Sequence, residues 1–137
     1  MRLFAALYPD DAAAAHLDLA LGGVRAHEQV RPGGAPLVRW VPREQWHVTV
    51  SFFGEVPDGA VPDLTAALAE AAALTPPLVL ALRGAGVFDR RVLWVGVGGD
   101  SDGLRALSAG AAAAAEDVGV HGDRRPRRRA HVTVARA

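Results

Sequence analysis

Hydrophobic and polar positions follow two different periods along this chain of 137 residues. Short apolar or alternating runs rich in β-branched and aromatic residues predict strands, whereas apolar positions spaced through alanine-rich runs predict helices. The predicted strands are residues 2–8, read as a buried strand, 37–41, 46–54, 76–88, 91–99 and 131–134. The predicted helices are residues 10–29, 62–74 and 101–118, so the expected order is β-α-β-β-α-β-β-α-β.

Local signals indicate how the helices begin and which face they bury. Leu17, Leu21 and Val24 fall on one face of the first helix and predict its buried side. Pro62 suits the first turn of the second helix. Ser101 is an acceptable N-cap for the third.

Composition narrows the class of protein. The length fits one ordinary domain, and the 50% hydrophobic content is enough for a real core. Apolar runs are interrupted before the roughly 18 residues of a membrane span, and no signal-peptide pattern is present. The chain has no cysteine, which excludes disulfides and zinc–thiolate sites. We therefore expect a cytoplasmic protein with no membrane association.

Charge gives one local signal. The formal net charge is zero, so no global field attracts nucleic acid. All basic residues are arginine, and five of them cluster at 124, 125 and 127–129. Such a cluster is most often a solvated loop.

The tetrapeptide His-Val-Thr-Val occurs twice, at residues 47–50 and 131–134. Because side chains alternate along a strand, His47 and Thr49 share one face, as do His131 and Thr133. A single His-x-Thr is a weak motif. The chain has only four threonines, however, and two of them follow a histidine by two residues. The repeat suggests two related lobes, with one such strand from each.

Two imidazoles and two hydroxyls suit a phosphate ester. One histidine can activate water while the other protonates the leaving oxygen, since imidazole titrates near neutral pH. Threonine hydroxyls can donate to non-bridging oxygens. His16, His27 and His121 are expected to be less important, and no metal-ligand spacing is present. We therefore expect neither a metal nor another cofactor.

These motifs resemble the two-histidine (2H) phosphoesterase superfamily, and within it the bacterial and archaeal RNA 2′,3′-cyclic phosphodiesterases, formerly named 2′-5′ RNA ligases. The similar stretches are MRLFAAL, VRWVPREQWHVTVSFFGEV, GAGVF, RRVLWVGV and HVTVARA, in order from Met1 to Ala137. The resemblance implies an α+β fold with two antiparallel sheets and flanking helices around a central cleft, related by a pseudo-twofold duplication.

The resemblance also implies a function and roles for residues. The activity would be hydrolysis of an RNA or nucleotide 2′,3′-cyclic phosphate to a 2′-phosphate. His47 would protonate the departing 3′ oxygen and His131 would activate water. Thr49 and Thr133 would hold phosphate oxygens. Phe53 could contact the base or belong to the core of its lobe. Arg136 follows the second motif as the family's arginine does, although strict alternation points it away from His131.

The chain departs from the family pattern in two places. Ala130 stands where proline is common, and the sequence stops three residues after Val134. The expected single bilobal domain, residues 1–137, would therefore lack the family's usual C-terminal helix and strand. An unpaired edge beside the last strand would favour a homodimer through that edge, or a less stable second lobe.

Two other function classes compete with the enzyme. The same cleft could bind a nucleotide without turnover. Alternatively, the arginine cluster could bind RNA while the repeated strands are merely structural. Turnover of a 2′,3′-cyclic mononucleotide in the presence of EDTA would identify the enzyme, and binding without turnover would identify the nucleotide-binding module.

Overall fold

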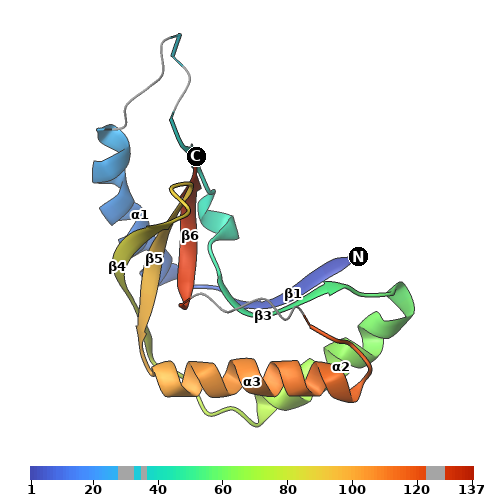
Figure 1. The fold of residues 1–137 in the computed structure, drawn as a ribbon. Coiled ribbons are helices and arrows are strands. Elements are labelled where there is room, and N and C mark those ends of the chain that lie inside the picture. Colours follow the sequence, from blue (N-terminus) through green and yellow to red (C-terminus); the bar gives the residue numbers. More distant parts are fainter. Residues whose placement is uncertain (28–32, 35–36, 123–128) are drawn as a thin grey trace. The chain divides into compact units, whose positions relative to one another are not determined.

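A computed structural model describes residues 1–27, 33–34, 37–122 and 129–137. Its elements, in chain order, are β1 (Arg2–Leu7), α1 (Asp11–Ala26), β2 (Arg39–Trp40), β3 (Val48–Glu55), α2 (Val61–Ala73), β4 (Leu80–Phe88), β5 (Val92–Gly99), α3 (Ser101–Asp117) and β6 (His131–Arg136) (Figure 1). Single 3₁₀ turns precede β3 and α2. The expected element order and the α+β class, with three helices and antiparallel strand pairing, are confirmed.

The helix ends differ slightly from the expectation. Asp100, not Ser101, caps α3, because its carboxylate accepts the Gly103 N–H at 2.9 Å and Ser101 is already helical. Asp10 caps α1 in the same way, at 2.8 Å from the Ala13 nitrogen. Helix α1 ends at Ala26, and the last two residues of its predicted range lie outside the described residues.

The chain divides into two compact units, which are described separately. Unit 1 contains Met1–Leu7, Thr49–Ala81 and Gly98–Arg129. Unit 2 contains Tyr8–Val48, Leu82–Val97 and Ala130–Ala137. Strand β3 therefore has its first residue, Val48, in unit 2 and its remainder in unit 1.

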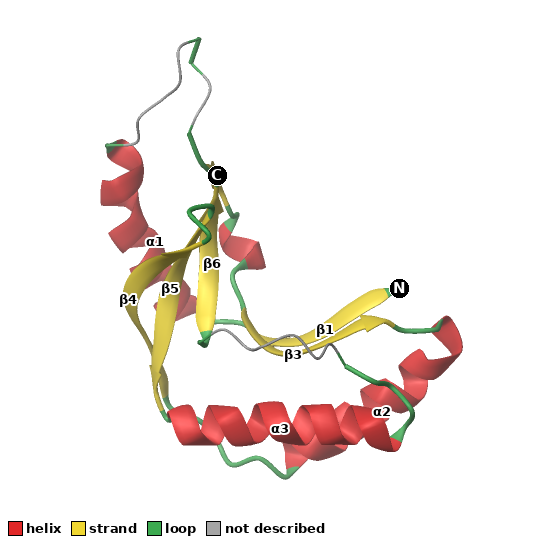
Figure 2. Cartoon of the chain, in the orientation of Figure 1, coloured by secondary structure: helices red, strands yellow, loops and turns green. Residues whose placement is uncertain are grey.

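The core of unit 1 lies between the strands β1 and β3 and the helices α2 and α3, which pack against each other (Figure 2). Its buried residues are Phe53, Val56, Leu64, Ala115 and Val120. Alternate residues of β1, Leu3 and Ala5, pack against this core, whereas Phe4 is 45% exposed. Residues 2–7 thus form a strand as expected, but only one face of it is covered in this unit, so the expectation of a buried strand is wrong.

Strand β6 has hydrogen-bonded neighbours on both sides in unit 2. Arg136 pairs with Arg39 of β2 and with Val92 of β5, and Val132 pairs with Val48 of β3 and Val95 of β5, all antiparallel. The expected empty flank beside the last strand is therefore wrong. The residues around Trp40 and Val48 occupy the side that β5 does not.

Helix α1 packs in unit 2 through one apolar stripe. Leu17 and Leu21 are buried as predicted, together with Ala14. The prediction for Val24 is wrong, because it is 54% exposed at the last turn. Arg25 extends over the Trp40 ring, 5.4 Å from its centroid. Among the described helices, none has the length and apolar character to cross a membrane.

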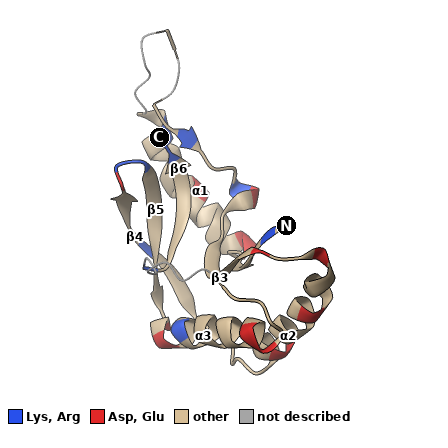
Figure 3. Cartoon of the chain, turned by 45° about the vertical axis from the view of Figure 1, so that its right-hand side comes forward, with Lys and Arg blue, Asp and Glu red and all other residues tan. Residues whose placement is uncertain are grey.

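The zero net charge conceals an uneven distribution. Among the described residues, carboxylates outnumber arginines in unit 1, and acidic residues are coloured red along α2 and α3 in Figure 3. Arginines outnumber carboxylates in unit 2. The unit that contains both repeated histidines is therefore the more favourable one for an anion.

Candidate active site

The pairing of Val48 with Val132 brings the two repeated motifs together. Both valines are buried, so the residues next to them project from the opposite face of the strand pair. Antiparallel register places His47 across from Thr133 and puts His131 on the same face, diagonal to His47. Diagonal neighbours have Cα atoms roughly 7–8 Å apart, which leaves room for one small group between two side chains. The two motifs therefore meet where β3 and β6 pair, with His47 directly before β3 and His131 as the first residue of β6.

A hydrogen bond and a buried neighbouring residue fix the position of His47. Its Nδ1 lies 2.7 Å from the carbonyl oxygen of Gln45. A carbonyl only accepts, so Nδ1 carries the hydrogen and Nε2 is the nitrogen that can exchange a proton with a substrate. The residue before it, Trp46, is completely buried and donates its indole N–H to the Val41 carbonyl at 3.2 Å. The buried Trp46 therefore fixes the backbone at His47, and the Gln45 carbonyl fixes the His47 tautomer with its hydrogen on Nδ1.

His131 sits against two aromatic rings. Phe88 meets it edge-on with ring centroids 4.9 Å apart, and Trp94 is 6.4 Å away. Phe88 and Trp94 are themselves stacked at 5.0 Å. The sequence reasoning missed both residues, because it read residues 76–88 and 91–99 only as strands. Their places at the end of β4 and in β5 bring them to β6.

Gly86 makes this packing possible. A Cβ atom at position 86 would overlap the six-membered ring of Trp94, which is 8% exposed and has little room to move. We expect Gly86→Ala to reduce the free energy of unfolding by about 1–3 kcal/mol through overpacking. Urea denaturation measures the loss. Gly110→Ala on α3, where a Cβ would meet nothing within 4 Å, is the matched control. Equal stability of the two variants would contradict this packing.

The two threonines of the motifs differ in exposure. Thr133 is half-buried on β6 beside His47. Thr49 is exposed and directly follows Val48 as the first residue of its segment of unit 1.

The ladder between β5 and β6 is irregular at Leu93 and Trp94, which leaves Val134 as an extra residue on β6. Val134 and Ala135 are consequently both buried. This bulge shifts the alternation by one residue and returns Arg136 to the His131 face.

Phe53 does not belong to the site. Its side chain is 3% exposed and lies in the hydrophobic core of unit 1 with Val56 and Leu64. Of the two places that the sequence left open for it, the structure assigns the core. Alternation along β3 puts Phe53 on the same side of the strand as Thr49, and the core of unit 1 covers that side at Phe53.

The other three histidines are exposed to solvent. His16 and His27 are exposed on or directly after α1, as expected, and His121 is exposed in unit 1. Over the described ranges, no three histidine or acidic side chains gather closely enough to hold a metal ion.

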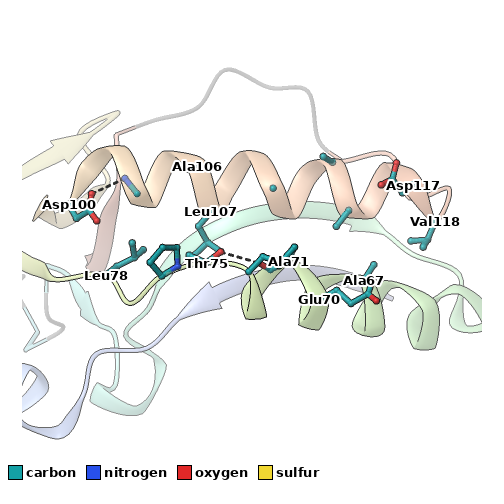
Figure 4. Close-up of a pocket in the computed structure, with 16 residues that line it drawn as sticks. Ala67, Glu70, Ala71, Thr75, Leu78, Asp100, Ala106, Leu107, Asp117 and Val118 are labelled. Carbon is teal, nitrogen blue, oxygen red and sulfur yellow. Dashed lines mark hydrogen bonds between the residues drawn. The ribbon is translucent and has the colours of Figure 1, made fainter.

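A hollow lies in unit 1 between α2 and α3, with a cavity volume of about 620 Å³ (Figure 4). Alanine, glycine and leucine form most of its lining, and Glu70, Asp100 and Asp117 are the carboxylates. It contains no imidazole, and its carboxylates do not favour an anion. The face of unit 2 that carries His47 and His131, here called the histidine face, is therefore the better candidate for phosphate chemistry.

Known proteins with similar sequences are phosphoesterases. Residues 11–94 match the family model of LigT-like phosphoesterases. The chain is 37% identical over 105 residues to the RNA 2′,3′-cyclic phosphodiesterase of Geobacillus stearothermophilus. This match covers 74% of the chain. The chain spans only 33% of the length of that relative.

Solved structures show the same fold. TT0787 of Thermus thermophilus superposes with a TM-score of 0.80 at 29% identity, covering 99% of this chain and 74% of its own. LigT of E. coli in its apo form gives 0.73 at 26% identity, with coverages of 98% and 71%. The complex of that protein with ATP gives 0.64 at 27% identity and the same coverages.

Proposed function

The chain belongs to the LigT-like phosphoesterase family, and from that premise we propose that it hydrolyses 2′,3′-cyclic phosphates on RNA ends or nucleotides to 2′-phosphates. The observation that carries the proposal is the Val48–Val132 pair, which brings the two His-Val-Thr-Val motifs together. The curated relative is named as an RNA 2′,3′-cyclic phosphodiesterase, and the E. coli relative has been crystallised with ATP.

In the proposed reaction, the cyclic phosphate lies between the two imidazoles. His131 accepts a proton from water as the water oxygen bonds to phosphorus. The bond between phosphorus and the 3′ oxygen breaks, and His47 gives that oxygen a proton from Nε2. The Gln45 carbonyl, 2.7 Å from Nδ1, stabilises the charged His47 ring before the transfer.

Three further side chains complete the proposed site. Thr133 lies beside His47, and its hydroxyl donates to a non-bridging phosphate oxygen. Thr49 follows Val48 directly and serves the same purpose for a second oxygen. Arg136, exposed on the His131 face after the bulge, attracts the anion. The excess of arginine over carboxylate in unit 2 adds to this attraction.

Product analysis after incubation with EDTA tests the proposal. We expect 2′,3′-cyclic AMP to be converted to 2′-AMP, and not 3′-AMP, at a rate that the chelator leaves unchanged, because the proposed steps use only protein side chains. Separation of the two isomers by chromatography gives the answer. Formation of 3′-AMP would contradict the assignment of the 3′ oxygen as leaving group. Saturable binding without turnover would instead identify a nucleotide-binding module.

Other features stay predictions alongside this activity. We propose that the chain is a single duplicated domain and that the protein works in the cytoplasm. A homodimer through an exposed strand edge is also still a proposal. Since β6 is flanked on both sides, such an edge would belong to β1, β2 or β4, each of which pairs with one other strand.

A further inference from the structure

We infer that Tyr8 is the base-recognition residue of this site and stacks on the nucleobase of the terminal nucleotide. Tyr8 lies beside His47, with ring centroids 6.1 Å apart and planes inclined at 52°. Its side chain is 66% exposed, so most of the ring is accessible to a ligand beside the half-buried His47 imidazole. The inference rests on the proposed function and adds a binding role that the reaction steps do not need.

The backbone holds Tyr8 firmly on both sides. It follows the last residue of β1 and precedes Pro9, whose ring fixes its own φ and restricts Tyr8 to extended conformations. Asp10 then caps α1 through its bond from Ala13 and accepts the Ala14 N–H at 2.9 Å through its carbonyl. An aromatic side chain on such a support loses little freedom when a ligand binds.

The other aromatic rings near the histidines are already engaged. Trp94 is buried, and Phe88 is half-buried between Trp94 and His131. Tyr8 is the ring on the His47 side, and most of its surface is accessible. A cyclic phosphate between the imidazoles keeps its ribose and base within a nucleotide's length of that ring. A base offers a flat π face that stacks on tyrosine regardless of its hydrogen-bonding pattern, and purines offer the larger area.

Kinetics with and without a base provide the first test. We expect Tyr8→Ala to raise KM for 2′,3′-cyclic AMP about 10-fold, equivalent to about 1.4 kcal/mol, and to leave kcat within about twofold. Turnover of glycerol 1,2-cyclic phosphate, which has no base, should not change. Tyr8→Phe keeps the ring and should behave like the wild type. Leu19→Ala, at a 79% exposed position on α1, is the control for loss of an exposed apolar side chain.

The opposite results have distinct meanings. An equal loss with the base-free substrate would overturn base stacking, and so would a Tyr8→Phe variant as impaired as Tyr8→Ala. A wild-type protein inactive on both substrates would instead contradict the proposed function, and a binding experiment would then decide the role of Tyr8.

That binding experiment uses the fact that Tyr8 is the one tyrosine in the chain. Protein labelled with 3-fluorotyrosine should give one ¹⁹F signal. We expect 2′-AMP to shift this signal through the ring current of adenine, whereas inorganic phosphate at saturation should shift it far less. Equal shifts with both ligands, or no shift at saturating 2′-AMP, would overturn the inference whether or not the protein turns over substrate.

Discussion

Replacing His131 or His47 by alanine should lower kcat for a 2′,3′-cyclic nucleotide by about 10²–10⁴-fold, the usual contribution of a positioned acid or base. Both rings project from the face opposite the buried Val48–Val132 pair, so each replacement removes a proton-transfer group without disturbing that pair. Because the two groups act in one transition state, we expect the double variant to be little worse than either single one. Steady-state kinetics with a fluorescent or chromatographic assay measures all three.

The pH profile separates the two roles. A general base must be neutral, so protonation of His131 causes the fall in rate at low pH. A general acid must be protonated, so deprotonation of His47 causes the fall at high pH. The residual activity of His131→Ala should therefore lose the low-pH limb, and that of His47→Ala the high-pH limb. The reverse pattern would exchange the assignments.

His16→Ala is the matched control, because His16 is exposed on α1 and lies outside the site. We expect it to retain wild-type kinetics. Near-normal activity of His47→Ala or His131→Ala would remove that residue from the mechanism, whereas a comparable loss in His16→Ala would show that histidine replacement impairs the fold.

The sequence predicted the element order because each element has a strong local signal. Apolar spacing around Leu17 and Leu21 suffices for a helix, and the β-branched run after Trp46 suffices for a strand. Boundaries were less certain where two residues compete. Asp100 and Ser101 can both cap a helix, and the structure selects the carboxylate that reaches the Gly103 N–H.

The site was predictable only as far as its repeated motif. Two copies of His-x-Thr on strands imply a shared face, but tertiary pairing determines which other residues join it. The bulge at Val134 reverses the direction that simple alternation gave Arg136. Phe88 and Trp94 reach His131 only after β4, β5 and β6 pair. Tyr8 was read as the end of a buried strand, since a single exposed aromatic residue has no periodic signal.

Among the replacements considered, we expect that of Trp46 to reduce the free energy of unfolding most. Its side chain is completely buried, and its indole donates to the Val41 carbonyl at 3.2 Å. The Val41 N–H in turn donates to the Val134 carbonyl of β6 at 2.9 Å. This chain of hydrogen bonds connects the residue before the first motif to the end of the second.

Trp46→Ala should therefore reduce the free energy of unfolding by about 3–5 kcal/mol, since it leaves a large cavity and removes the donor to Val41. Urea denaturation followed by the fluorescence of Trp40 and Trp94 measures this loss. Trp46→Phe keeps most of the ring and should cost about 1–2 kcal/mol, so that the refolded site still holds His47 and retains activity. Leu74→Ala, at an 86% exposed position, should change stability by no more than about 0.5 kcal/mol. A Trp46→Ala variant as stable as Leu74→Ala would show that neither the burial of this indole nor its link to β6 supports the histidine face.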